Sequence, residues 1–156
     1  MSFEIKILTK PIRKFKSFFS IGKNERFSFV QAFIFSGFYR AFILFIPFNK
    51  LKKQIGKHKF ESPKEVDLES ITKAKEVRWA VTQAAKHTPW ESKCLVQALT
   101  ASNMMKIKGI STTLYLGVKK NENNEMIAHA WVRCGDFYIT GGDNRWGYVV
   151  VATFST

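Results

Sequence analysis

Cysteine is scarce in this chain: only Cys94 and Cys134 occur in 156 residues. They form no C-x-x-C pair and no cluster with histidine at metal-ligand spacing, so the sequence does not indicate a zinc site. The first twenty residues mix Lys, Arg and Phe without a continuous apolar core or a cleavage site, which argues against a signal peptide. We therefore expect a reducing cytosol, in which the two cysteines stay unpaired.

Acidic residues are rare at the start of the chain. Residues 1–60 contain 13 Lys and Arg against 2 acids, whereas residues 61–156 contain 12 against 10, so most of the net charge of +13 lies in the first part. We interpret residues 1–60 as a basic docking arm and residues 61–156 as a separate folded domain. Such an arm has the charge to meet anionic lipid, nucleic acid or an acidic protein, but no nucleic-acid motif accompanies it.

Polar side chains are few between Phe27 and Ile46. Ser28 and Gln31 fit a capping box and Pro47 ends the run, so we expect a helix over residues 28–46. A helix of about 20 residues is long enough to cross a bilayer, but Arg40 lies inside it and both flanks are basic. Three alternatives stay open: the helix packs on its own domain, lies on a membrane or a partner, or spans a membrane.

Two further helices are expected before residue 110. After a linker at residues 57–63, one begins near Ser62 or Asp67 and ends before Pro89. The next is capped by Ser92 and closed by Gly109.

The second half of the chain alternates in the manner of strands. We expect strands at residues 110–118, 126–133, 137–140 and 148–154, with tight turns at 135–136 and 141–144. Helices followed by antiparallel strands predict an α+β fold.

Cys94 and His129 carry the chemistry that this order of elements allows. Cys94 follows PWESK at a helix start, and His129 lies in the strand segment AHAWVR. Free N–H groups at a helix N-terminus stabilise a thiolate and a developing oxyanion, and an imidazole can take the thiol proton and pass it to a leaving amine. Alone, each residue is explained by packing, and His58 and His87 are explained as solvated surface. The catalytic hypothesis requires that the sulfur and the imidazole meet in an accessible groove.

Four motifs carry a resemblance to a known family. The run PW-x-x-x-CL-x-x-AL, then G-I-x-x-x-L-x-L-G-V, AHAWV, and TGG with a VVATF ending resemble the transglutaminase-like leader peptidases of lasso-peptide biosynthesis. The likeness covers about residues 27–156. It implies a transglutaminase-like or papain-like core, with residues 61–156 as the catalytic domain. It also implies a cysteine peptidase that removes the leader from a ribosomally made precursor, with Cys94 as nucleophile and His129 as general base and acid.

The resemblance leaves three candidates for the third catalytic group. The family often carries an Asp about a dozen positions after the His, where this chain has Thr140, Gly141 and Gly142. Asp143 is the nearest acid and is our prediction for this role. A three-residue turn after Cys134 would place it opposite His129, whereas a two-residue turn would not. Asp136 and a backbone carbonyl are the alternatives.

The resemblance also implies partners. A separate recognition protein is expected to hold the leader, and a separate ATP-dependent cyclase to act afterwards, because the chain has neither a leader-binding module nor a P-loop. We expect no cofactor and no metal. A transamidase using the same Cys and His, and a non-catalytic membrane- or partner-binding module, are the alternative functions. We expect a cytoplasmic protein, with residues 1–60 in contact with the recognition protein or peripherally with the inner membrane surface.

Overall fold

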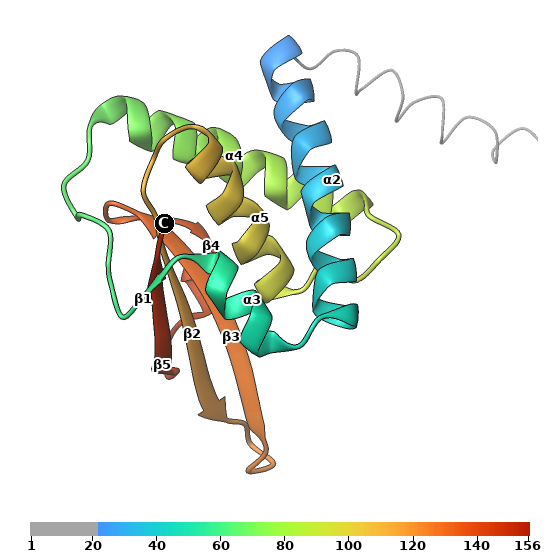
Figure 1. The fold of residues 1–156 in the computed structure, drawn as a ribbon, viewed down its shortest axis with the longest axis vertical. Helices are drawn as coiled ribbons and strands as arrows, with labels where there is room; N and C mark the ends of the chain where they lie inside the picture. Colours follow the sequence, from blue (N-terminus) through green and yellow to red (C-terminus); the bar gives the residue numbers. More distant parts are fainter. Residues whose placement is uncertain (1–21) are drawn as a thin grey trace, which may run out of the picture.

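The structure, a computed structural model, describes residues 22–156, so the first part of the predicted basic arm lies outside the described residues. Four helices and five strands follow one another as shown in Figure 1. The helices are α2 (Lys23–Phe45), α3 (Phe48–Ile55), α4 (Leu68–His87) and α5 (Cys94–Ile107). The strands are β1 (Lys57–His58), β2 (Thr113–Lys120), β3 (Met126–Cys134), β4 (Phe137–Thr140) and β5 (Val149–Ser155), with a 3-10 turn at Gly142–Asn144.

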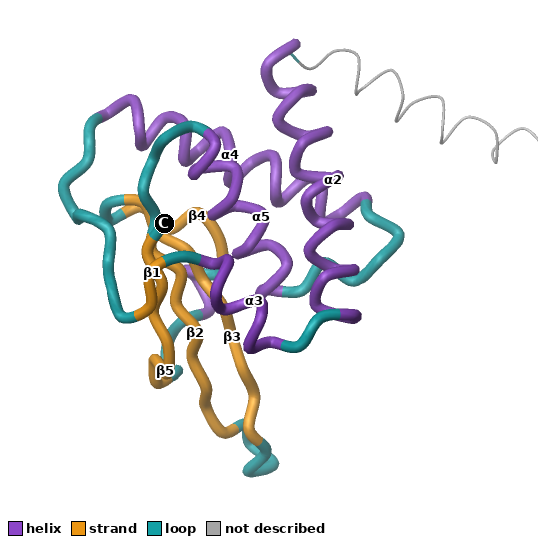
Figure 2. The backbone as a smooth tube through the Cα atoms, in the orientation of Figure 1, coloured by secondary structure: helices purple, strands orange, loops and turns teal. Residues whose placement is uncertain are grey.

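The strands form one sheet in the order β1-β5-β2-β3-β4, and every neighbouring pair is antiparallel. Helix α5 packs on β2, β3 and β4, α4 packs beside it on β3 and β4, and α2 crosses the outside of α4 and α5 (Figures 1 and 2). The predicted α+β class, with helices over an antiparallel sheet, is therefore confirmed. Each predicted strand is present with bounds shifted by at most three residues.

The core lies between the sheet and the helices. Small residues on α4 and α5 let these helices approach each other closely, and larger apolar side chains from the strands fill the space beneath them. The buried residues include Ala74, Val77, Ala80, Val81, Ala84, Ala98, Ala101, Met104, Met105, Leu114, Val132, Ile139 and Phe154. Leu51 and Ile55 of α3 are buried in the same core. The division at residue 60 stays a prediction, although residues from both sides of it share this core.

Helix α2 begins five residues earlier than predicted. The Glu25 carboxylate accepts a hydrogen bond from the Gly22 N–H at 3.2 Å, and Ser28, predicted as the cap, is instead buried inside the helix. With Ala32 and Ser36, Ser28 forms the face that packs on the domain, so the helix does pack on its own domain along one side. Among the described residues, α2 is the one helix long and apolar enough to cross a membrane.

The predicted start is right for α4, whereas the predicted capping residue is wrong for α5. Asp67, one of two expected starts, caps α4 by accepting a hydrogen bond from the Ser70 N–H at 2.6 Å, and this bond lowers the pKa of Asp67. The prediction that Ser92 caps the next helix is wrong, because Lys93 occupies that position and contributes no side-chain cap. The Ser92 carbonyl accepts a hydrogen bond from the Gln97 amide at 2.6 Å instead.

Candidate active site

A cleft of about 230 Å³ opens beside the first turn of α5, and both Cys94 and His129 border it. It lies among α3, α5 and strands β2, β3 and β5. The other residues around it are apolar or glycine: Phe48, Leu95, Leu116, Gly117, Val118, Ala128, Ala130 and Val151. An apolar lining of this kind favours an uncharged group over a charged one.

Cys94 is the first residue of α5 and is half-buried at the edge of the core. The first turn of this helix contains no acidic residue, and no side chain caps it within residues 22–156. Its free backbone N–H groups and the positive end of the helix dipole therefore favour negative charge at this place. This is the environment in which a thiolate and an oxyanion are stabilised.

The His129 ring is held on several sides. Its Nε2 lies 2.8 Å from the Gly141 carbonyl oxygen, which can only accept, so Nε2 carries the proton and donates it. Nδ1 is thus the nitrogen that can accept a proton from a thiol. The ring also stacks on Trp131, with 5.7 Å between ring centroids, and makes a tilted contact with the Tyr148 ring at 5.2 Å.

The structure brings Cys94 and His129 to one cleft without joining them. No hydrogen bond between the thiol and the imidazole is present among the described residues. Ala130, next to His129 on β3, belongs to the core against which Cys94 packs. Because side chains alternate along a strand, the imidazole lies on the other face of β3, with Trp131. The two groups therefore approach the cleft from different sides of the strand, and the catalytic pairing stays a prediction.

Asp143 makes no hydrogen bond to His129 among the described residues. Its carboxylate pairs with Arg78 of α4 at 3.2 Å, and its side chain is 84% exposed. The turn after Cys134 has two residues, a bulge shifts the register to Val132 opposite Thr140, and β4 ends there. The hydrogen bond on the imidazole comes from the backbone of Gly141, twelve positions after His129. In the structure the contact to the imidazole is therefore made by the backbone carbonyl, which was one of the alternatives, and the catalytic role of Asp143 stays a prediction.

The other candidate residues lie away from the cleft. Asp136 is exposed in the turn between β3 and β4. The exposed His87 places Nδ1 2.7 Å from the Gln83 carbonyl, and the His58 ring makes a tilted contact with the Phe154 ring at the sheet edge. Sequence reasoning missed Gly141, Trp131 and Tyr148 as supports of the imidazole, although the TGG segment had marked the position of the first.

Gly141 is expected to be intolerant of any side chain. It has φ +68°, and a Cβ there would lie 2.4 Å from the Ala130 carbonyl oxygen and 3.0 Å from His129 Nε2. Gly109 is a matched control, because it has φ +73° and a Cβ there would have no heavy atom within 4 Å. We expect Gly109→Ala to cost about 1 kcal/mol of unfolding free energy and Gly141→Ala to cost roughly 1–3 kcal/mol more. Urea denaturation of both variants measures this, and equal losses would contradict the close contact.

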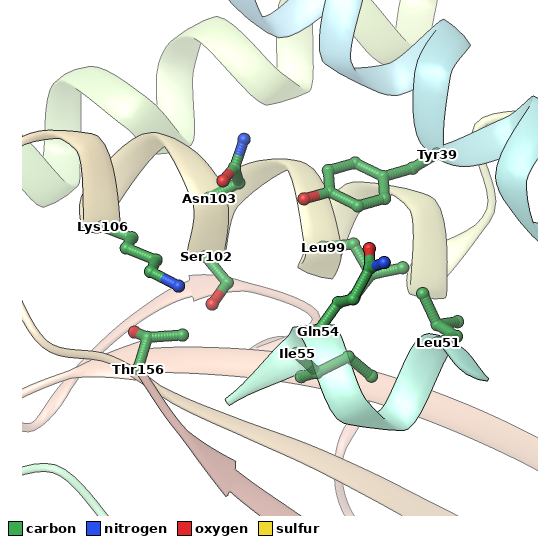
Figure 3. A pocket seen from close by; sticks show the side chains of 9 residues that line it. All are labelled: Tyr39, Leu51, Gln54, Ile55, Leu99, Ser102, Asn103, Lys106 and Thr156. Carbon is green, nitrogen blue, oxygen red and sulfur yellow. The ribbon is translucent and has the colours of Figure 1, made fainter. Parts of the chain in front are cut away.

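A second hollow lies away from these residues, between α3 and α5 (Figure 3). Tyr39, Ser102, Lys106 and Thr156 are among its lining residues, and its volume of about 30 Å³ holds only one or two water molecules. Burial raises the pKa of Tyr39, so its hydroxyl stays neutral there. This hollow is too small for a substrate.

Comparison with known proteins points to one family. The family model described as "Transglutaminase-like superfamily" matches residues 42–153, which include the whole cleft. No curated protein and no solved structure matches the chain. Members of this superfamily are generally cysteine-dependent enzymes. Since the match covers well over half of the sequence, the chain belongs to the transglutaminase-like superfamily.

Proposed function

We propose that this protein is a cysteine peptidase that removes the leader from a ribosomally made lasso-peptide precursor. One observation carries the proposal: the Cys94 thiol lies at the uncapped N-terminus of α5, beside an apolar cleft that His129 also borders. The resemblance of the PW…CL and AHAWV motifs to leader peptidases supplies the substrate class. Cys94 is the nucleophile, His129 the general base and acid, and the Gly141 carbonyl the group that orients the ring.

The reaction proceeds in two balanced steps. The His129 imidazole takes the Cys94 proton, and the sulfur attacks the carbonyl carbon of the scissile peptide bond. The backbone N–H groups at the start of α5 stabilise the oxyanion. The carbon–nitrogen bond then breaks, the imidazolium gives its proton to the leaving amine, and an acyl-enzyme remains. Water, deprotonated by the same imidazole, releases the acid and restores the thiol.

This chemistry places one requirement on the protein. Nδ1 of His129 must come within hydrogen-bond reach of the Cys94 sulfur in the reacting complex. His129 lies in the part of β3 that β4 does not pair, since the β3–β4 ladder covers only Val132 to Cys134. The backbone there is held by β2 on one side, through the pairing of His129 with Gly117. The proposed reaction therefore requires that this part of β3 rearranges, so that the imidazole reaches the face on which Cys94 lies.

The products of the reaction distinguish the proposed peptidase from a transamidase. The full chain is incubated with the precursor peptide and a recognition protein encoded beside it, with and without an added primary amine, and the products are weighed by mass spectrometry. Two fragments whose masses sum to the precursor plus one water support hydrolysis. Two products would instead identify acyl transfer to an amine. One is a precursor heavier by the mass of the amine less ammonia, and the other is a fragment heavier than the hydrolysed fragment by the amine less one water. An unchanged precursor would contradict both.

His129→Ala is expected to lower the cleavage rate by about 10²–10⁴-fold, because the thiol loses its proton acceptor. His87→Ala is the matched control, since its ring is exposed, hydrogen-bonds to Gln83 and lies against Phe29, away from the cleft, and it should cleave at the wild-type rate. Full cleavage by His129→Ala would remove this residue from the mechanism while leaving the role of Cys94 open to its own test.

The partners and the location belong to the same proposal. A separate protein holds the leader, a separate ATP-dependent cyclase closes the ring, and the enzyme works in the cytoplasm. Asp143 contributes through Arg78, which also donates to the Tyr138 carbonyl at 3.1 Å and so ties α4 to the segment that carries Gly141.

A further inference from the structure

Helix α2 presents two opposite apolar faces, and only one of them is packed. At 100° per residue, Phe27, Ile34, Phe38 and Phe45 fall within about 40° of one another on the helix. Ser28, Ala32 and Ser36 lie on the other half and are buried against the domain. The outer apolar side chains are 44% to 83% exposed: Phe27, Val30, Ile34, Phe38, Leu44 and Phe45. We call these six residues the outer stripe.

The outer stripe runs the full length of the helix. Its 23 residues span roughly 34 Å, so the stripe is a long convex ridge rather than a groove. Most soluble proteins expose apolar side chains singly rather than in a continuous ridge of this length. Large exposed apolar patches mark interaction sites.

Basic residues stand at both ends of the stripe. Lys23 is exposed at the start of α2, and Lys50, Lys52 and Lys53 are exposed on α3, which follows its other end. Residues 26–60 contain no Asp or Glu. Phe, Leu and Ile in the middle with lysines at both ends match the interface of an anionic bilayer, where rings enter the acyl boundary and ammonium groups meet the headgroups.

The packing of the inner face determines how the helix meets a membrane. The Trp90 indole N–H donates to Ser36 Oγ at 3.3 Å, and Arg40 pairs with Glu91 at 3.3 Å. A Cβ at Gly37 would lie 3.0 Å from the Trp90 ring, so the helix and the domain fit closely there. Crossing a bilayer would break these contacts, whereas lying flat on it leaves them intact.

We infer that α2 docks the protein on an anionic phospholipid surface, with the helix parallel to the membrane and the outer stripe inserted. Phe48, the first residue of α3, borders the cleft of Cys94 and so links the end of α2 to the candidate site. The inference does not depend on the proposed peptidase activity.

Co-sedimentation with lipid vesicles tests the inference. The full chain is mixed with vesicles of phosphatidylcholine alone, or with a quarter of phosphatidylglycerol. We expect binding to the anionic vesicles at least tenfold stronger than to the neutral ones, and weakened when salt is raised from about 0.1 M to about 0.5 M. No binding to anionic vesicles, or equal binding to both lipids, would overturn the inference.

Two isoleucines make a matched pair of variants. Ile34 lies in the outer stripe and is 61% exposed, whereas Ile107 ends α5 and is 59% exposed. Ile34→Glu should lower vesicle binding about tenfold and Ile107→Glu should leave it unchanged, with both melting like the wild type. Cys94→Ala should bind vesicles normally, which separates docking from catalysis. Vesicle binding by Ile34→Glu equal to that of the wild type would contradict the insertion of the outer stripe. If the wild type does not bind vesicles, and light scattering shows that it forms a dimer which Ile34→Glu loses, the stripe is instead an interface between two copies of the chain.

Discussion

Replacing Cys94 with alanine is expected to lower the rate of precursor cleavage by roughly 10⁴-fold or more, because the substitution removes the nucleophile that forms the acyl-enzyme. The variant should fold normally. Cys94 is half-buried as the first residue of α5, and alanine is a good helix former that removes only the sulfur. The measurement is single-turnover cleavage of the precursor, followed by mass spectrometry.

Cys134→Ala is the matched control for this variant. Cys134 is completely buried, and desolvation raises the pKa of its thiol, so this sulfur is neutral and out of reach of a substrate. We expect Cys134→Ala to cleave at the wild-type rate with a small loss of stability, and iodoacetamide to label only Cys94 in the native protein. Cleavage by the Cys94→Ala protein at the wild-type rate would exclude cysteine catalysis altogether.

Replacing Arg133 with methionine is expected to lower the free energy of unfolding by roughly 3 kcal/mol. The Arg133 side chain is only 4% exposed. It donates to Tyr115 Oη at 2.8 Å and to the Glu61 carboxylate at 2.9 Å. It also donates to the carbonyls of Ser62, Gly135 and, at 3.4 Å, Pro63. Methionine fills much of the space but leaves the buried carbonyls of Ser62 and Gly135 without this donor.

Arg78→Met is the control for the loss of an arginine as such. Arg78 is 44% exposed and Asp143 84% exposed, so their ion pair at 3.2 Å is expected to contribute less than about 1 kcal/mol. Arg78→Met also removes the bond to the Tyr138 carbonyl, which adds about 1 kcal/mol. Urea denaturation of both variants gives the comparison. Equal losses would mean that the contacts of Arg133 do not hold the segment before α4 on the sheet.

The sequence predicted the strands and their order well but predicted the helix starts poorly. Strand β4 was predicted with its observed bounds, because the tight turns on either side of it are marked by Gly135 and Gly141. Helix α3 and strand β1 were missed, since α3 has only Leu51 and Ile55 as buried residues and β1 pairs over only two positions. A buried Ser28 and a capping Ser28 have the same local sequence, so only packing separates them.

In the candidate site, too, local patterns predicted where each residue lies, whereas packing determined its contacts. Local patterns were enough to place Cys94 at a helix start and His129 on a strand. Pro89 marks the break before the helix, and the alternation of apolar residues marks the strand. The sequence by itself also determined the α+β order of elements and the separation of the basic charge from the rest of the chain.

Only the tertiary structure decided which group holds the imidazole, on which face of β3 that ring lies, and which side of α2 is packed. The partner of His129 depends on a bulge between Val132 and Arg133 and on the end of β4, which together bring the Gly141 carbonyl to Nε2 and leave Asp143 with Arg78. Contacts of this kind form between residues far apart in the chain, and the energy of one register over another comes from packing that no local pattern contains.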